Sequence, residues 1–270
     1  MKNLCNQKTL HNALGSAQPL GCEILQGHLY HSIPIRRCIA FFAIFLSLVC
    51  WCQITLAESS GLTVRHGDRS SARVAITVDD CYDRKHISAA IDLSELYQVP
   101  ITFFPIGSAL KYDDAALWQR ALDAGCEIGN HSWGHKNLTK LNARKIKFQM
   151  LRTQEKLDAM LRYHYPMQVM RPPFGSTNNA VSEAVESVGY RRIVKWDVSQ
   201  TDYKKAIKQV QNGSILLYHA RAKDIRCLTK LIPLLLEHGY ECVTVSELLG
   251  LKSVATSTDL YVYHREQLDD

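Results

Sequence analysis

The segment RVAITVDD, Arg73–Asp80, is a mostly apolar, β-rich run that ends in two carboxylates. Such a run is typical of a strand buried within a sheet. Two adjacent carboxylates after a buried strand repel each other and lose hydration unless a cation or an arginine lies close. The segment therefore predicts both a strand and a charged site at its end.

Outward from this segment, short β-rich runs alternate with longer runs of helical periodicity. This alternation predicts an α/β fold with a parallel sheet covered by helices, and seven βα-like units favour a barrel. The seven predicted strands are Arg73–Val78, Ile101–Phe104, Cys126–Gly129, Met167–Arg171, Arg192–Trp196, Ser214–Tyr218 and Cys242–Val245. The predicted helices are Ala115–Ala124, Ala143–Tyr163, Ala180–Val188 and Asp224–His238.

An uncharged apolar run covers residues 38–57 and directly follows Arg36 and Arg37. Arginines before an apolar run, with the small residue Ala57 at a cleavage position, indicate a signal peptide. A run of about 20 residues is also long enough to span a bilayer. The preceding residues 1–37 are many for the start of a signal sequence. A cleaved signal peptide and a retained membrane anchor therefore both stay open, and either predicts export to the cell envelope or the medium.

Beyond this run the chain divides into a linker at 58–72, one domain at 73–251 and a polar C-terminal tail at 252–270. The 270 residues carry a formal net charge of +6 without a long basic run, so nucleic acid is not an expected partner. A solvated helix face is the simplest interpretation of the one basic cluster, which consists of Lys136, Lys140, Arg144, Lys145 and Lys147. A monomer is expected.

Four of the nine cysteines fall within the domain, and none of them has the spacing of a zinc knuckle. Export to an oxidising compartment permits a disulfide, for which Cys227 and Cys242 are the expected pair. A domain of this size does not need one for stability.

The unusual polar residues of the domain follow the predicted strands. In a parallel barrel the C-terminal ends of the strands share one face, where active sites are built. This placement predicts a single site formed by Asp79, Asp80, His131, Arg171, Asp197, Asp202 and His219.

The segment HSWGH, 131–135, places two histidines four residues apart. A helical turn would bring both imidazoles to one metal. Spacing alone is a weak signal, but Asp80 adds a carboxylate, and such a mixed site leaves coordination positions for water and substrate.

The segment RPPFG, Arg171–Gly175, is a stiff turn, because its prolines fix the backbone and its glycine permits close approach of a ligand. An arginine at a strand end is able to hold a carboxylate, and the turn is able to aim a backbone N–H at a developing oxyanion. His219, directly after an apolar run, is the remaining candidate acid.

Together, TVDDC (77–81), HSWGH (131–135), RPPFG (171–175), WDVSQTDY (196–203) and LYH (217–219) resemble the five ordered motifs of the NodB-homology polysaccharide deacetylases, carbohydrate esterase family 4. The resemblance extends from about Arg73 to Leu251. It implies a distorted (β/α) barrel, a divalent metal ion that is commonly Zn²⁺, and hydrolysis of N-acetyl or O-acetyl groups on a polysaccharide such as peptidoglycan or chitin-like oligomers.

The resemblance also assigns roles to single residues. Asp79 is the expected general base, Arg171 orients it, and His219 is the acid that protonates the departing amine. Asp202 is expected to tune His219. The expected metal ligands are Asp80, His131 and His135. The amide of Phe174 is the expected oxyanion donor, and the expected substrate contacts are Pro173, Phe174, Tyr203 and Leu217.

Two positions depart from the family pattern. Cys81 replaces the usual glycine after the two aspartates, and Tyr203 replaces the usual tryptophan. Besides polysaccharide deacetylation, the sequence leaves two other functions open. One is amide hydrolysis or deformylation of a small or lipid-linked substrate, and the other is carbohydrate binding without catalysis.

Overall fold

The computed structural model describes residues 61–260. The tail at 1–37 and the apolar run at 38–57, with the two hypotheses for it, lie outside the described residues. Among residues 61–260, no helix combines the length and the apolar character that crossing a membrane requires.

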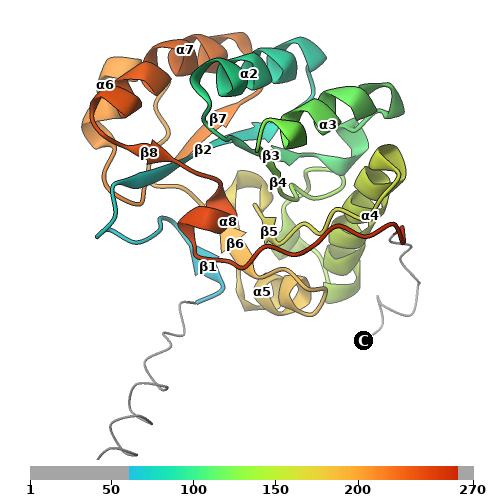
Figure 1. The fold of residues 1–270 in the computed structure, drawn as a ribbon. Helices are drawn as coiled ribbons and strands as arrows, with labels where there is room; N and C mark the ends of the chain where they lie inside the picture. Colours follow the sequence, from blue (N-terminus) through green and yellow to red (C-terminus); the bar gives the residue numbers. More distant parts are fainter. Residues whose placement is uncertain (1–60, 261–270) are drawn as a thin grey trace, which may run out of the picture. The chain divides into compact units, whose positions relative to one another are not determined.

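Within residues 61–260, eight strands form two parallel sheets (Figure 1). The smaller sheet has the order β1-β6-β5, and the larger one has the order β4-β3-β2-β7, with β8 paired to β2. The strand bounds are β1 Thr63–Val64, β2 Arg73–Asp80, β3 Thr102–Pro105, β4 Glu127–Ile128, β5 Val169–Met170, β6 Arg192–Val194, β7 Ile215–His219 and β8 Glu241–Cys242.

Two isolated bridges join the sheets into a barrel. Asn130, just after β4, pairs in parallel with Met170 of β5, and Val198, just after β6, pairs in parallel with Leu216 of β7. The ring β2-β3-β4-β5-β6-β7 thereby closes, although two of its junctions consist of a single bridge. Such thin junctions account for the distortion of the barrel.

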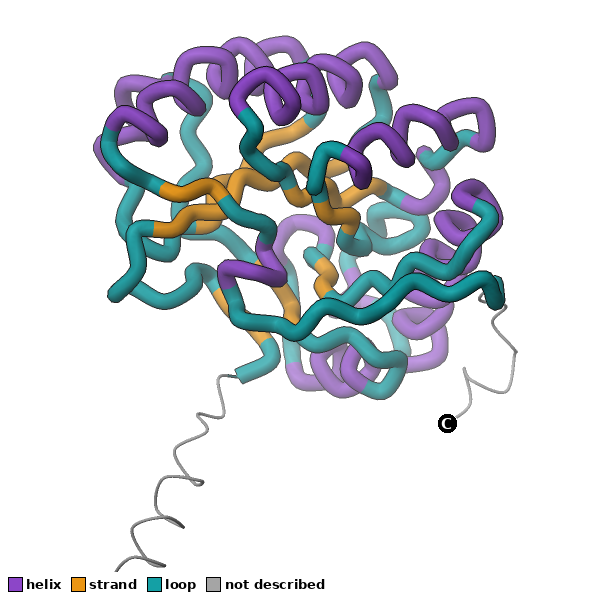
Figure 2. Tube along the Cα trace, in the orientation of Figure 1, coloured by secondary structure: helices purple, strands orange, loops and turns teal. Residues whose placement is uncertain are grey.

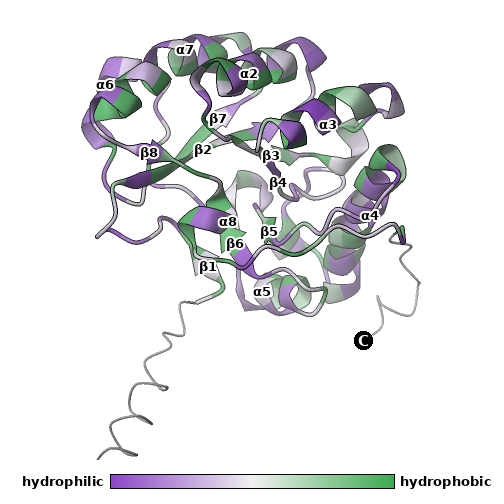
Figure 3. Ribbon diagram, in the orientation of Figure 1, coloured by the Kyte–Doolittle hydropathy of each residue, from purple (hydrophilic) through white to green (hydrophobic). Residues whose placement is uncertain are grey.

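Helices cover the outside of the strands (Figures 1 and 2). The α-helices are α2 Arg84–Tyr97, α3 Ala115–Asp123, α4 Ala143–Leu161, α5 Asn179–Glu186, α6 Tyr203–Gln209, α7 Ala222–Glu237 and α8 Val245–Leu248. Short 3-10 helices lie at η1 Gly107–Ala109, η2 Tyr112–Asp114, η3 Leu138–Lys140 and η4 Pro173–Gly175. Helices α2 and α7 alternate hydrophobic and hydrophilic positions along the ribbon, as amphipathic surface helices do (Figure 3).

The alternation of side chains along β2 explains how the barrel places its site. Val74, Ile76 and Val78 belong to the large core cluster that also contains the buried residues of the helices. The residues between them point to the opposite face, since successive side chains of a strand alternate. One of these, Ala75, joins a smaller cluster with residues of β3, β5, β6 and β7, which we assign to the barrel interior. Thr77 and Asp79 share the face of Ala75 and therefore point inward.

All seven predicted strands are present, and the predicted helices correspond to α3, α4, α5 and α7. Part of the predicted linker at 58–72 belongs to the barrel instead, because Thr63 and Val64 form β1 and pair with β6. The last predicted strand is too long, since Val245 begins α8. The tail at 252–270 is not free throughout, because Ser257 exchanges two backbone hydrogen bonds with His164.

The disulfide that export would permit between Cys227 and Cys242 is absent. Both residues are buried as free cysteines, as are Cys81 and Cys126. The solvated basic face is also only partly right, because Lys147 is buried within α4.

Candidate active site

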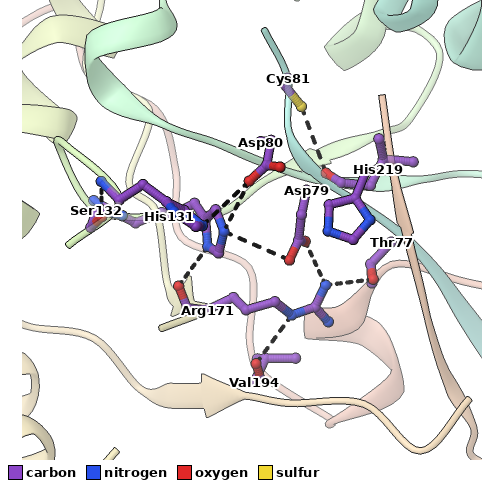
Figure 4. A network of polar contacts seen from close by, with 12 residues as sticks. Thr77, Asp79, Asp80, Cys81, His131, Ser132, Arg171, Val194 and His219 are labelled. Carbon is purple, nitrogen blue, oxygen red and sulfur yellow. Dashed lines mark hydrogen bonds and ion pairs between the residues drawn. The ribbon is translucent and has the colours of Figure 1, made fainter. Parts of the chain in front are cut away.

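Strand ends bring the predicted residues together on one face of the barrel (Figure 4). Asp79 and Asp80 end β2, and His219 ends β7 directly opposite Asp79 in the parallel register. His131 follows β4, and Arg171 follows β5, beside Asn130. These five residues therefore lie together, as the strand pattern predicted, and their roles in a site stay a prediction.

Arg171 is fully buried and neutralises Asp79. Its Nη1 donates to Asp79 Oδ1 at 2.7 Å and to Thr77 Oγ1 at 2.6 Å. Its other N–H groups donate to the backbone carbonyls of Val194 and Lys195. Burial lowers the pKa of Arg171, but the neighbouring Asp79 carboxylate opposes that shift. The fixed guanidinium therefore leaves Asp79 Oδ2 as the oxygen that faces His131, at 3.8 Å from its Nε2.

The segment 131–135 does not form the helical turn that the spacing suggested. Ser132 and His135 instead adopt left-handed backbone conformations, with φ of 65° and 51°. Side chains hold this shape: Asn130 Oδ1 accepts from the Ser132 N–H, and Ser132 Oγ accepts from the His135 N–H. Two sharp bends thus bring the imidazoles together, with ring centroids 5.0 Å apart.

Asp80, His131 and His135 form a three-residue group of metal-ligand type. One ligand atom of each lies within 4.8 Å of the other two. Asp80 Oδ1 is 3.5 Å from Nε2 of His131 and 3.5 Å from Nε2 of His135. His131 Nδ1 lies 2.8 Å from the Arg171 carbonyl, which only accepts, so Nδ1 carries a proton and Nε2 is the ring atom that faces Asp80.

The charges within this group favour a carboxylate and a neutral imidazole. Burial alone would raise the pKa of Asp80, but the neighbouring His131, His219 and His135 outweigh it, so the pKa of Asp80 is lowered. Burial, followed by the nearby His131, lowers the pKa of His135. Both shifts place these groups in the protonation state that binds a metal ion.

Cys81 is buried, and its thiol donates to the Val78 carbonyl instead of joining the three ligands. Burial, together with Asp79 and Asp80, raises the pKa of Cys81, so the thiol stays protonated. Its left-handed backbone, with φ of 58°, is a conformation that glycine adopts without strain.

We expect Cys81→Gly to preserve or raise activity and Cys81→Ser to change it only modestly, because this thiol has no chemical step to perform. Acetate release and zinc affinity of both variants test this expectation. A collapse of activity in both would show that the sulfur takes part in the reaction.

Two of the predicted carboxylates make local structural contacts. Asp197 Oδ2 binds Arg69 at 2.8 Å and Ser214 at 2.9 Å, which fixes the entry to β7. Asp202 is exposed and accepts from the N–H groups of Lys204 and Lys205, so it caps helix α6. The expected role of Asp202 toward His219 therefore stays a prediction, since the contacts of the Asp202 side chain lie at the start of α6. The carboxylate that contacts His219 is Asp224, in the first turn of α7.

The four expected substrate contacts differ in exposure. Phe174 is 66% exposed, and its ring lies edge-on to His135 at 4.7 Å. Tyr203 is half-buried at the start of α6. Pro173 and Leu217 are buried and offer little surface. Substrate contact by any of the four stays a prediction, with Phe174 and Tyr203 the better placed.

Sequence reasoning missed Thr77, Arg221 and Asp224 as neighbours of the site. Thr77 stands two residues before Asp79 and therefore lies on the same face of β2. The alternation of side chains along the strand could have predicted this position. Asp224 and Arg221 follow His219 within five residues, but a polar residue at a helix start is ordinarily read as a cap.

Comparison with known proteins shows the family to which this chain belongs. The family model described as polysaccharide deacetylase matches residues 66–193. The peptidoglycan-N-acetylglucosamine deacetylase PgdA of Listeria monocytogenes is 31% identical over 194 residues, which cover 68% of this chain and 40% of that protein. A peptidoglycan-N-acetylglucosamine deacetylase of Bacillus cereus is 30% identical over 209 residues, which cover 72% of this chain and 96% of that protein.

A solved structure shares the fold with a TM-score of 0.64 and 25% sequence identity, covering 71% of this chain and 72% of that chain. It is a mutant of a carbohydrate esterase family 4 pseudoenzyme from Bacillus anthracis, with restored enzymatic activity. This chain spans less than half the length of the Listeria relative but matches nearly all of the Bacillus cereus one. The chain belongs to the polysaccharide deacetylases of carbohydrate esterase family 4.

Proposed function

We propose that this protein is an exported, metal-dependent hydrolase that removes acetyl groups from the amide nitrogens of a cell-envelope polysaccharide, with peptidoglycan as the expected substrate. The observation that carries the proposal is the convergence of Asp80, His131 and His135 beside the buried Asp79–Arg171 pair. The relatives named as peptidoglycan-N-acetylglucosamine deacetylases support the substrate class.

The three proposed ligands fit a divalent ion. Asp80 Oδ1 is a buried oxygen without a hydrogen-bond partner, and the Nε2 atoms of both histidines lie near it. One carboxylate and two imidazoles are a ligand set that suits Zn²⁺. An ion held there would polarise the acetyl carbonyl and lower the pKa of a bound water.

The remaining groups supply proton transfer. Asp79 Oδ2, on the side away from Arg171, takes a proton from the attacking water. His219, opposite Asp79 on β7, donates a proton to the departing amine. The Phe174 N–H, in the stiff turn after Arg171, is the proposed donor to the developing oxyanion.

Acetate release from a substrate panel tests this proposal. The full chain is incubated with peptidoglycan, chitooligosaccharides and acetylated xylan, with and without a chelator. We expect release from the N-acetylated substrates, loss of release with the chelator, and recovery when Zn²⁺ is added. The proposal would be contradicted if the chain released acetate from none of the substrates, or if the chelator left the release unchanged.

Carbohydrate binding without catalysis is the second candidate, because the similar solved structure derives from a pseudoenzyme. Contacts among Asp79, Asp80, the two histidines and Arg171 favour the catalytic proposal. Binding of chitooligosaccharides without acetate release would favour the second candidate. An N-formylated substrate added to the panel separates deformylation from deacetylation.

The exposed ring of Phe174 is expected to pack against a sugar face. Phe174→Ala removes that surface and should raise KM roughly tenfold, about 1.4 kcal/mol of binding, with kcat changed less. Leu96→Ala is the matched control, because Leu96 is an equally exposed hydrophobic side chain on α2. An unchanged KM in Phe174→Ala would remove Phe174 from the substrate contacts.

A further inference from the structure

The surroundings of His219 include a carboxylate that the family motifs did not point to. Asp224 Oδ2 accepts the backbone N–H of His219 at 3.0 Å and lies 3.5 Å from His219 Nδ1. Asp224 is 1% exposed, and its Oδ1 is buried without a hydrogen-bond partner. A buried carboxylate with an unused oxygen beside an imidazole is suited to stabilise the charged form of that ring.

Arg221 connects the same two residues. Its Nε donates to Asp224 Oδ2 at 2.8 Å, and its Nη2 lies 3.0 Å from His219 Nδ1. A guanidinium only donates, so Nδ1 accepts in this arrangement and the neutral ring carries its proton on Nε2. A second proton would enter at Nδ1, where Asp224 is the nearby acceptor. Arg221 therefore favours neutral His219, and Asp224 favours the imidazolium.

The ionisation of Asp224 agrees with this arrangement. Burial alone would raise the pKa of Asp224, but hydrogen bonds from His219 and Arg221 outweigh it and hold the pKa below its usual range. Asp224 is therefore ionised at neutral pH. It provides the negative charge that a protonated His219 ring needs beside it.

We propose that Asp224, and not Asp202, is the positioning residue of His219, and that Arg221 limits the charge on the ring. This inference rests on the proposed role of His219 as the acid in deacetylation. It differs from the role that the motif resemblance assigns to Asp202, whose oxygen is already used at the start of α6.

Two asparagine variants of the full chain separate the carboxylates. Asp224→Asn keeps an oxygen that accepts from His219 and Arg221, removes the charge and places an NH2 group at the buried position of Oδ1. Asp202→Asn keeps the helix cap, because asparagine caps as well as aspartate does. Kinetics on a chitooligosaccharide, zinc content and the unfolding midpoint are measured for both.

We expect kcat of Asp224→Asn to fall ~10–10²-fold, with KM and zinc content unchanged, because an acid without its partner transfers protons poorly. Asp202→Asn should change kcat less than about twofold, within the scatter of surface substitutions. If Asp224 had a structural role alone, Asp224→Asn would lower the unfolding midpoint but would not lower kcat at an unchanged KM.

The pH profile supplies a readout specific to the pair. Loss of the carboxylate disfavours the imidazolium, so the limb of kcat that reports the acid should move to lower pH in Asp224→Asn. Arg221→Gln removes the opposing cation and should move this limb of kcat to higher pH. Because the Arg221 side chain is half exposed, this variant tests the proposal even if Asp224→Asn folds poorly. The other charged groups near His219, which are Asp79, Asp80 and His135, are unchanged in all variants.

The outcomes distinguish the two proposals. A wild-type chain that releases no acetate contradicts the proposed function, and NMR titration of the His219 ring in wild type and Asp224→Asn then tests the pairing alone. A lower imidazole pKa in the variant supports it, and an equal pKa overturns it. With an active wild type, unchanged kcat and pH limb in Asp224→Asn, or a large kcat loss in Asp202→Asn, would overturn the inference.

Discussion

Alanine at His131 or His135 should abolish both metal binding and acetate release. Each histidine is one of the three ligands proposed among residues 61–260, so its loss should leave the ion weakly held. His135→Ala is the cleaner variant, because the His135 side chain is partly exposed, whereas removal of the buried His131 also leaves the Arg171 carbonyl without its donor. We expect zinc stoichiometry near zero and no measurable turnover in both.

His238→Ala is the matched control, since His238 is exposed at the end of α7, outside the site. It should retain zinc and full activity. Stoichiometric zinc in either His131→Ala or His135→Ala would contradict the ligand assignment, whatever the activity of that variant.

Asp79→Asn should leave the metal bound while kcat falls ~10²–10⁴-fold, which is the rate acceleration that a positioned acid or base usually contributes. The amide keeps an oxygen for Arg171 but cannot take a proton from water. The buried Arg171 then lacks its counter-charge, so the unfolding midpoint should also fall, and activity must be assayed well below it.

Asp80→Asn provides the reciprocal variant. It removes the carboxylate that contacts both histidines and should lose zinc together with activity. Loss of zinc in Asp79→Asn with retention in Asp80→Asn would mean that the two aspartates have exchanged roles.

The strands and the residues at their ends were predictable because both depend on local pattern. The run before Asp79 and Asp80 has the composition of a buried strand, and parallel strands place their C-terminal ends on one face. Barrel closure was not predictable in this way. It depends on single bridges, Asn130 to Met170 and Val198 to Leu216, between segments far apart in the sequence.

The loop conformation at the histidines shows a second limit. The spacing of His131 and His135 correctly indicated convergence, but two left-handed residues and the side chains of Asn130 and Ser132 achieve it, not a helix. Local spacing does not encode such side-chain support, because Asn130 is itself held by Met150 and Tyr190 from other elements.

The carboxylates show a third limit. Asp197 and Asp202 both follow a strand, as active-site residues do, yet each satisfies a local structural need, at the start of β7 and at the start of α6. Asp224 carries no strand-end signal. Only the return of the chain from β7 into α7 places it against His219.

The central claim is that Asp80, His131 and His135 hold a metal ion that deacetylation requires. Its most direct test is titration of the chelated full chain with Zn²⁺ while acetate release from an N-acetylated chitooligosaccharide is recorded. We expect no release from the chelated protein and a linear recovery that ends at one equivalent of zinc, with no recovery in His135→Ala. Equal release before and after chelation, or recovery in His135→Ala at one equivalent, would contradict it.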